Sequence, residues 1–194
     1  MLGVNLFCLT PEESLTKLLQ GNERYIQDKI LHKDPVDMRR QSVVLQQNPF
    51  AVILGCSDSR VPPEMIFDQD LGDLFVIRIA GNVITPEVMA SIEYATLYLG
   101  SNLIFVLGHE NCGAVNSVIR GVTRDIEPIA ERIVKALKRL GKTTYDLSFY
   151  IKTNTQYVAD EIKKNAVIKK LLQEKKIDVV GGFYFLESGK VELI

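Results

Sequence analysis

The sequence predicts an α/β fold, in which helices flank a central, mostly parallel β-sheet, with a helical arm at the N-terminus and an antiparallel edge at the C-terminus. Two observations support this prediction. Short runs rich in Val, Ile, Leu and Phe alternate along the chain with longer segments of helical periodicity. These runs are apolar at consecutive positions, which is typical of parallel strands covered on both faces. We find no internal repeat and no low-complexity segment, so we expect a single domain over residues 1–194.

The arm is expected over residues 10–45 and begins with a helix. Thr10 suits an N-cap, Pro11 the first helical position, and Glu13 the position that completes a capping box. An apolar stripe follows at Leu15, Leu18, Leu19 and Tyr25, with Ile26 beside it. Residues 33–41 are polar and include a proline, which predicts a connector or a loose helix.

The sheet is expected to contain four strands joined by helices. We predict strands at residues 51–55, 74–80, 102–107 and 177–182, and a closing hairpin over residues 183–194. A short helix or turn begins near residue 61, and longer helices are expected at residues 86–99, 114–119, 126–140 and 151–175. The pair Gly81-Asn82 ends the second strand, and Gly141 is the stop signal of the helix at residues 126–140.

The composition is that of an ordinary soluble globular protein. The 194 residues are 46% hydrophobic and 24% charged, and the formal net charge of -1 gives no reason to expect nucleic acid or an anionic membrane as a partner. No apolar run approaches the roughly 18 residues that span a bilayer. Residues 1–10 lack the basic start of a secretory signal, so we expect a cytoplasmic protein.

Two short strings carry most of the chemistry of the chain: Cys56-Ser57-Asp58-Ser59-Arg60 and His109-Glu110-Asn111-Cys112-Gly113. Each string directly follows a predicted strand. The carboxyl ends of parallel strands meet at one edge of a sheet, which is where ligands bind in such folds. We therefore expect the thiols, the imidazole, the carboxylate and the guanidinium to lie close together.

The two strings together favour a metal site. A lone Cys at a strand end is usually a packed core residue, but the three-residue spacing of His109 and Cys112 at a second strand end favours ligation. Three cysteines in a reducing compartment are also more typical of metal binding than of a disulfide scaffold. Two thiolates and one imidazole leave a tetrahedral zinc ion one ligand short, which is typical of a catalytic zinc site.

Other chemical groups have plainer interpretations. Asp58 and Arg60 alone would be a surface ion pair of little value, although here they follow the first predicted ligand, Cys56. We assign no role to Cys8 or His32. The lysine-rich tract at residues 163–176 is interpreted as a solvated helix face rather than a docking patch.

The pattern Cys-x-Asp-x-Arg followed by His-x-x-Cys closely resembles the β-class carbonic anhydrases. The resemblance covers nearly the whole chain. It includes the amphipathic first helix, the strand at residues 73–78, the pair Gly81-Asn82 and the segment at residues 179–185.

The resemblance implies one Zn²⁺ per subunit, held by Cys56, His109 and Cys112, with water in the fourth position. It implies reversible hydration of CO2 to bicarbonate and a proton by a zinc-bound hydroxide. Asp58 would accept a hydrogen bond from that hydroxide, and Arg60 would fix Asp58 and keep it ionised. Two thiolates make zinc a weaker acid towards water than three imidazoles do, so activity is expected to rise through mildly alkaline pH.

The resemblance also implies a substrate pocket shared between subunits. Gln47 would orient a substrate oxygen, with help from the backbone N–H of Gly113. Phe75, Ala80 and, from a neighbouring subunit, Tyr94 would form the apolar wall. The helical arm would embrace the partner, which gives a homodimer or a tetramer made of two dimers.

Three positions bear on the subtype, and a fourth departs from the second motif. Some family members carry a Trp three positions before the first zinc Cys, as part of a bicarbonate site that stabilises an inactive form with the Asp on zinc. Here that position is Ile53, which together with Gln47 favours the open-site subtype, with Asp58 a ligand only if a closed form exists. Arg78 matches another part of that inhibitory site. Ala114 replaces a Gly of the second motif and adds only a methyl group.

Several alternatives use similar residues. Relatives of this fold hydrolyse carbonyl sulfide or carbon disulfide with the same metal shell. A non-enzymatic structural zinc module would use Asp58 as the fourth ligand. A nucleotide-binding domain or a zinc alcohol dehydrogenase would need a glycine-rich phosphate-binding string, and the sequence has none.

Overall fold

The computed structural model describes residues 9–31, 36–138, 140 and 146–194. Its centre is a five-stranded sheet in the order β2-β1-β3-β4-β5. The strands are β1 (Ala51–Gly55), β2 (Leu74–Arg78), β3 (Leu103–His109), β4 (Asp178–Tyr184) and β5 (Val191–Leu193). Strands β1 to β4 are all parallel to one another, and β5 is antiparallel to β4. The predicted fold class is confirmed, including the antiparallel edge at the C-terminus.

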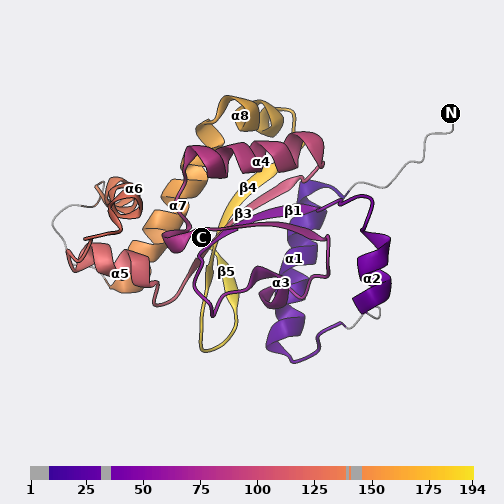
Figure 1. Cartoon of the computed structure of the whole chain (residues 1–194), viewed down its shortest axis with the longest axis horizontal. Coiled ribbons are helices and arrows are strands. Elements are labelled where there is room, and N and C mark those ends of the chain that lie inside the picture. The colour runs from indigo at the N-terminus through magenta and orange to yellow at the C-terminus, as the bar shows by residue number, and fades with distance from the viewer. Residues whose placement is uncertain (1–8, 32–35, 139, 141–145) are drawn as a thin grey trace.

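Helices cover both faces of the sheet (Figure 1). The chain order is α1 (Pro11–Ile26), α2 (Val36–Ser42), α3 (Pro63–Ile66), α4 (Pro86–Tyr98), α5 (Gly113–Ile119), α6 (Glu127–Leu137), α7 (Leu147–Lys164) and α8 (Ala166–Gln173). Helices α1 and α3 lie on one side of the sheet, and α4 and α8 lie on the other (Figure 1). Among the described residues, no helix is both long and apolar enough to cross a membrane.

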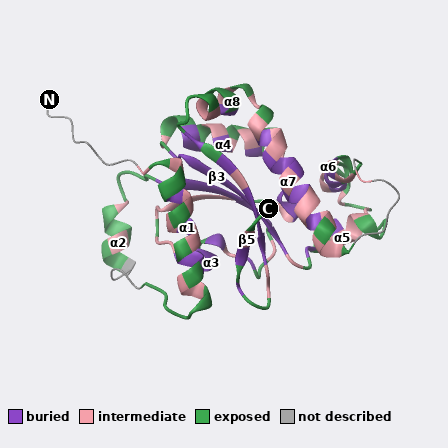
Figure 2. Ribbon diagram, turned by 180° about the vertical axis from the view of Figure 1, so that it is seen from behind, coloured by how far each residue is buried: buried purple, intermediate pink, exposed green. Residues whose placement is uncertain are grey.

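The central strands are buried on both faces (Figure 2). Along β3, Phe105 packs with the α1 and α3 side, and its neighbours Ile104 and Val106 pack with the α4, α7 and α8 side. Alternate residues of one strand thus enter two separate hydrophobic cores. This arrangement explains why the sequence shows unbroken apolar runs rather than an alternating pattern.

The predicted bounds of five elements were wrong. The predicted helix at residues 151–175 is two helices, because the side chain of Asn165 accepts hydrogen bonds from the N–H groups of Val167 and Ile168 and caps α8. Strands β3 and β4 each run two residues further than predicted, since His109 pairs with Tyr184. Strand β2 ends two residues early, at a turn over residues 80–82. Helix α6 ends at Leu137; the predicted stop at Gly141 lies outside the described residues, as do Cys8 and His32.

The first helix packs on the core of its own chain. Its Leu18 is fully buried, and Ser14 donates a hydrogen bond to the side chain of Asn102 at 2.6 Å. The buried Asn22 amide donates to the carbonyls of Ile66 and Gly189 and accepts from the N–H of Val191 at 2.8 Å. Asn22 therefore connects α1 to α3 and to the hairpin between β4 and β5.

Candidate metal centre

Three ligand atoms meet at the carboxyl edge of the sheet. Cys56 follows β1, His109 is the last residue of β3, and Cys112 is the N-cap of α5. The two sulfur atoms and a ring nitrogen of His109 all lie within 4.8 Å of one another, and all three residues are buried. The register explains the meeting: Gly55 is paired with Leu107, so the residues that follow both strands emerge at one level.

The histidine is oriented for ligation. Its Nδ1 lies 2.8 Å from the carbonyl oxygen of Glu110, and because a carbonyl only accepts, Nδ1 carries the proton. The Nε2 atom therefore presents a lone pair. It is buried and has no hydrogen-bond partner among the described residues. A buried acceptor aimed at two sulfur atoms is the arrangement that a metal ion would complete.

The two thiols share their protons unequally. A hydrogen bond from Cys112, helped by His109 and the N–H of Gly81, lowers the pKa of Cys56 to about 4 against the opposing effect of burial. The same hydrogen bond, together with burial, raises the pKa of Cys112. One sulfur is thus readily a thiolate, and a divalent cation would take the place of the proton held by the other.

Asp58 and Arg60 form an ion pair beside the cluster. Arg60 donates to both carboxylate oxygens of Asp58, at 2.9 and 2.8 Å. These bonds hold the pKa of Asp58 well below its usual range. The carboxylate lies 3.9 Å from Nε2 of His109. Asp58 is therefore ionised and adjacent to the cluster.

Arg78 forms hydrogen bonds with the loop that carries Cys56 and Asp58. Its guanidinium donates to the backbone carbonyls of Cys56, at 3.0 Å, and Asp58. Only the family resemblance gave Arg78 a role, as part of an inhibitory site. The hydrogen bonds of Arg78 to this loop could not be predicted from the sequence, because every residue has a backbone carbonyl that could accept them.

The remaining predicted site residues fall into two groups. Ala80 and Gly113 lie at the metal cluster: Ala80 begins the turn that contacts Cys56, and Gly113 is the first residue of α5. Gln47, Phe75 and Tyr94 lie together elsewhere. Gln47 and Tyr94 line one surface hollow, and the rings of Phe75 and Tyr94 are 6.2 Å apart.

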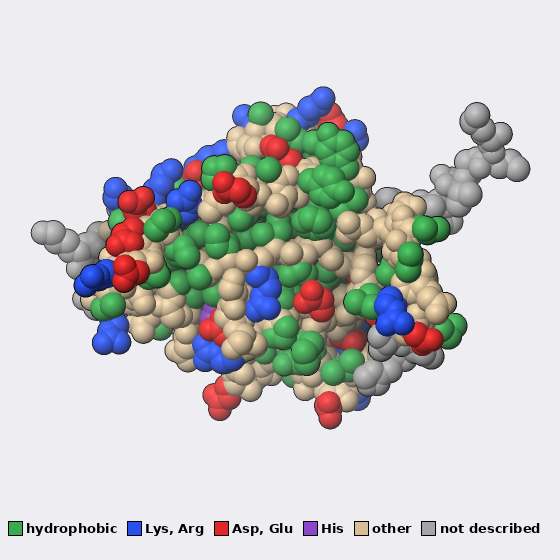
Figure 3. Space-filling model, viewed as in Figure 1, with side chains coloured by type: hydrophobic (Ala, Val, Ile, Leu, Met, Phe, Trp, Pro, Cys, Tyr) green, Lys and Arg blue, Asp and Glu red, His purple; other side chains and the backbone are tan. Residues whose placement is uncertain are grey.

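The second group lies away from the cluster in the same chain. Phe75 pairs with Val52, four residues before Cys56, which corresponds to about 13 Å along a strand. The hollow is surrounded by exposed apolar side chains on α4 and on the segment after α2. The most exposed are Val44 at 70%, Leu45 at 98% and Tyr98 at 76%. Figure 3 shows hydrophobic side chains gathered over α4.

Comparisons with known proteins agree on one family. A profile described as carbonic anhydrase matches residues 51–191. Carbonic anhydrase 2 of Mycobacterium tuberculosis is 35% identical, with 94% of this chain and 92% of that protein covered. The carbonic anhydrase of Mycolicibacterium smegmatis is 36% identical, with 94% and 93% covered.

Solved structures have the same fold. The β-carbonic anhydrase CafA of Aspergillus fumigatus superposes with a TM-score of 0.75 at 23% identity, over 94% of this chain and 89% of that one. One of two tetrameric β-carbonic anhydrases of Sordaria macrospora gives a TM-score of 0.70 at 23% identity, over 93% and 96%. At these identities the likeness concerns the fold.

Proposed function

The chain belongs to the carbonic anhydrase family and has the β-class fold, so it catalyses the reversible hydration of CO2 to bicarbonate and a proton, and we propose that it does so at a zinc ion held by Cys56, His109 and Cys112. The observation that carries the proposal is the unpartnered Nε2 of His109, which faces two buried sulfur atoms. Sulfur and imidazole nitrogen are ligands that zinc prefers. The matches favour CO2 over carbonyl sulfide and carbon disulfide as the substrate.

When bound, zinc supplies a water ligand acidified enough to serve as the nucleophile. The residues around the metal determine how that nucleophile is held. Asp58 is ionised and therefore only accepts hydrogen bonds, so it would accept one from the O–H of the nucleophile and leave an oxygen lone pair free to face CO2. Arg60 keeps the carboxylate in place and charged.

The pairing of Asp58 supports an open site. Both of its carboxylate oxygens accept hydrogen bonds from Arg60, and Asp58 would have to give up or share one of these bonds to become a fourth ligand. Arg78 is engaged with two backbone carbonyls of the same loop, which fixes the loop in this arrangement. We therefore propose that Asp58 acts as an acceptor and not as a structural zinc ligand.

We also propose that the substrate pocket is completed by a second copy of the chain. Gln47, Phe75 and Tyr94 lie on an exposed apolar surface, about a strand length from the metal ligands of their own chain. A homodimer that buries this surface would place the three side chains at the partner's cluster. The outer strand β2 is only partly buried in the single chain, which agrees with an interface there. Oligomers also occur in this fold, since the relatives from Sordaria macrospora are tetrameric.

The first experiment is stopped-flow CO2 hydration on protein of measured zinc content, from about pH 6.5 to about pH 9. We expect rapid turnover that rises with pH, because two thiolates weaken the acidity that zinc confers on water. Removal of the metal by a chelator should abolish the activity, and equimolar zinc should restore it. Fully zinc-loaded protein without CO2 hydration would overturn the function, and activity that survives complete removal of zinc would overturn the proposed site.

A further inference from the structure

The turn after β2 contacts the cluster of Cys56, His109 and Cys112. The backbone N–H of Gly81 donates a hydrogen bond to the sulfur of Cys56 at 3.3 Å. Such a bond stabilises negative charge on the sulfur and fixes the direction of its lone pairs. The orientation of the Gly81 backbone therefore matters to the predicted ligand.

Gly81 is held in an unusual backbone conformation. Its φ of +71° is one that residues with a side chain rarely adopt. A Cβ at this position would lie 3.0 Å from Cδ1 of Ile133 and 3.2 Å from Cβ of Ala114. The glycine is thus enclosed by α5 and α6, and only a residue without a side chain fits.

Helix α7 supplies the polar contacts that hold this turn. Asn154 is fully buried, and its Nδ2 donates to the carbonyl oxygen of Gly81 at 2.9 Å. The next residue, Thr155, is also fully buried and accepts a hydrogen bond from the side chain of Asn82 at 3.5 Å. Two adjacent residues of one helix therefore bind two adjacent residues of the turn.

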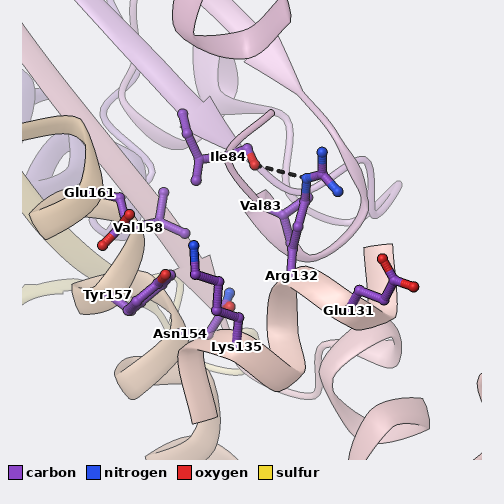
Figure 4. Close-up of a pocket in the computed structure, with 9 residues that line it drawn as sticks. All are labelled: Val83, Ile84, Glu131, Arg132, Lys135, Asn154, Tyr157, Val158 and Glu161. Atoms are coloured by element: carbon purple, nitrogen blue, oxygen red, sulfur yellow. Dashed lines mark hydrogen bonds between the residues drawn. The ribbon is translucent and has the colours of Figure 1, made fainter. Parts of the chain in front are cut away.

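The rest of the Asn154 side chain has no comparable contact. It lines a cavity of about 340 Å³ between α6, α7 and Val83-Ile84 (Figure 4). Its Oδ1 is buried and has no hydrogen-bond partner among the described residues. The amide is therefore placed for the turn rather than for a contact between helices.

We propose that Asn154 is a positioning residue for the metal centre. It fixes the Gly81 backbone, and Gly81 in turn directs an N–H at the sulfur of Cys56. The interaction reaches the metal from α7, outside both ligand strings. This inference rests on the zinc site proposed above.

The test compares Asn154→Leu with Val158→Ala. Leucine has the same branched skeleton of side-chain heavy atoms as asparagine but no donor, and the cavity leaves room for its greater volume. Val158 lies one turn further along α7, where it is buried and lines the same cavity. Its aliphatic side chain has no donor and so makes no hydrogen bond to Gly81. The control thus disturbs the packing of α7 without removing the hydrogen bond.

Three quantities are measured on each protein: the zinc dissociation constant, the sulfur-to-cobalt charge-transfer absorption of the cobalt-substituted form, and the melting temperature. We expect Asn154→Leu to weaken zinc binding about 10-fold or more and to move the cobalt band to lower energy, since the thiolate loses its N–H donor. Val158→Ala should lower the melting temperature and leave both metal properties at their wild-type values.

The outcomes separate this inference from the proposed function. If the wild-type protein binds neither zinc nor cobalt, the metal site itself is wrong and the inference falls with it. If the wild-type protein binds both metals and Asn154→Leu gives the band and affinity of Val158→Ala, Asn154 is a structural residue and only the inference is overturned.

Discussion

Asp58 is the side chain through which the chemistry of the proposed zinc site can be tested most directly. Its carboxylate is paired with Arg60 through two hydrogen bonds and lies beside His109. Arg60 is half exposed, so water can solvate its guanidinium if the partner is changed. The pair can therefore be altered without leaving a buried charge, which makes its role in the reaction testable.

Asp58→Asn should reduce CO2 hydration about 100-fold while zinc remains bound. An amide can donate a hydrogen bond to the lone pair of the nucleophile, whereas the carboxylate only accepts from it. Turnover and zinc content are measured together, with Glu64→Gln as a control that removes one exposed negative charge. Loss of zinc in Asp58→Asn would instead indicate a structural ligand, and full activity would remove Asp58 from the mechanism.

The cluster of possible metal ligands could be predicted from the sequence, but the contacts that support it could not. Cys56, His109 and Cys112 follow apolar strands, and parallel strands bring such ends together whatever separates them in the chain. Asn154 and Gly81 are 73 positions apart and meet through a backbone carbonyl. No residue pattern encodes that contact, because any residue has a carbonyl.

At the level of whole elements, the contact between α1 and α3 depends on one glycine. A Cβ on Gly21 would lie 1.7 Å from the carbonyl oxygen of Phe67. That oxygen belongs to the backbone, so it cannot move aside as the tip of a side chain would. The two helices approach as closely as they do because Gly21 has no side chain.

Gly21→Ala should destabilise the protein by about 3 kcal/mol, because α1 must move away from α3. Helix propensity alone predicts the opposite sign, a gain of up to about 1 kcal/mol. Urea denaturation measures the free energy of unfolding. Thr16→Ala, at an exposed position of the same helix, should change stability by less than about 1 kcal/mol. A stable Gly21→Ala protein would mean that the two helices are not in close contact.

The break between α7 and α8 could not be predicted from hydrophobic periodicity. Apolar positions continue through residues 151–175, so the pattern predicted one helix. Asn165 is a good N-cap residue, and here its side chain caps α8 and also donates to Glu93 of α4 at 2.8 Å. The signal was a single residue within a regular pattern, and a tertiary contact decided its conformation.

For the molecule as a whole, the main expectation is a site divided between two chains. The cluster of possible metal ligands is buried, whereas Gln47 and Tyr94 line a surface hollow and Phe75 lies beside Tyr94. The family resemblance implied only Tyr94 as a contribution from the neighbouring subunit. The register of β1 and β2 extends that assignment to Phe75.

Dimers made of one Asp58→Asn chain and one Gln47→Leu chain should have about half of the wild-type activity, although each variant alone is nearly inactive. One of their two sites carries both changes, and the other carries neither. The two chains are co-expressed with different tags, and the mixed dimer is purified through both. Inactive mixed dimers would show that each chain contains its whole site, and a monomeric wild-type protein would exclude the shared pocket.

The fold class could be predicted because its two signals agree. Runs that are apolar on both faces require helices on both sides of the sheet, and alternating strands and helices require parallel pairing. The attachment of α1 could not be predicted in the same way. Ser14 forms a hydrogen bond with a residue 88 positions away in the chain, and Asn22 forms one with a residue 169 positions away.

The contacts of Asn22 also have a consequence for the order in which the protein forms on the ribosome. Two of its three partners, Gly189 and Val191, are translated 167 and 169 residues after it. At the usual speed of synthesis, roughly 10 to 30 seconds separate the two ends of that contact. During this interval the nascent α1 has no hairpin to bind. Helix α1 can therefore reach its final place only after the hairpin between β4 and β5 has been made.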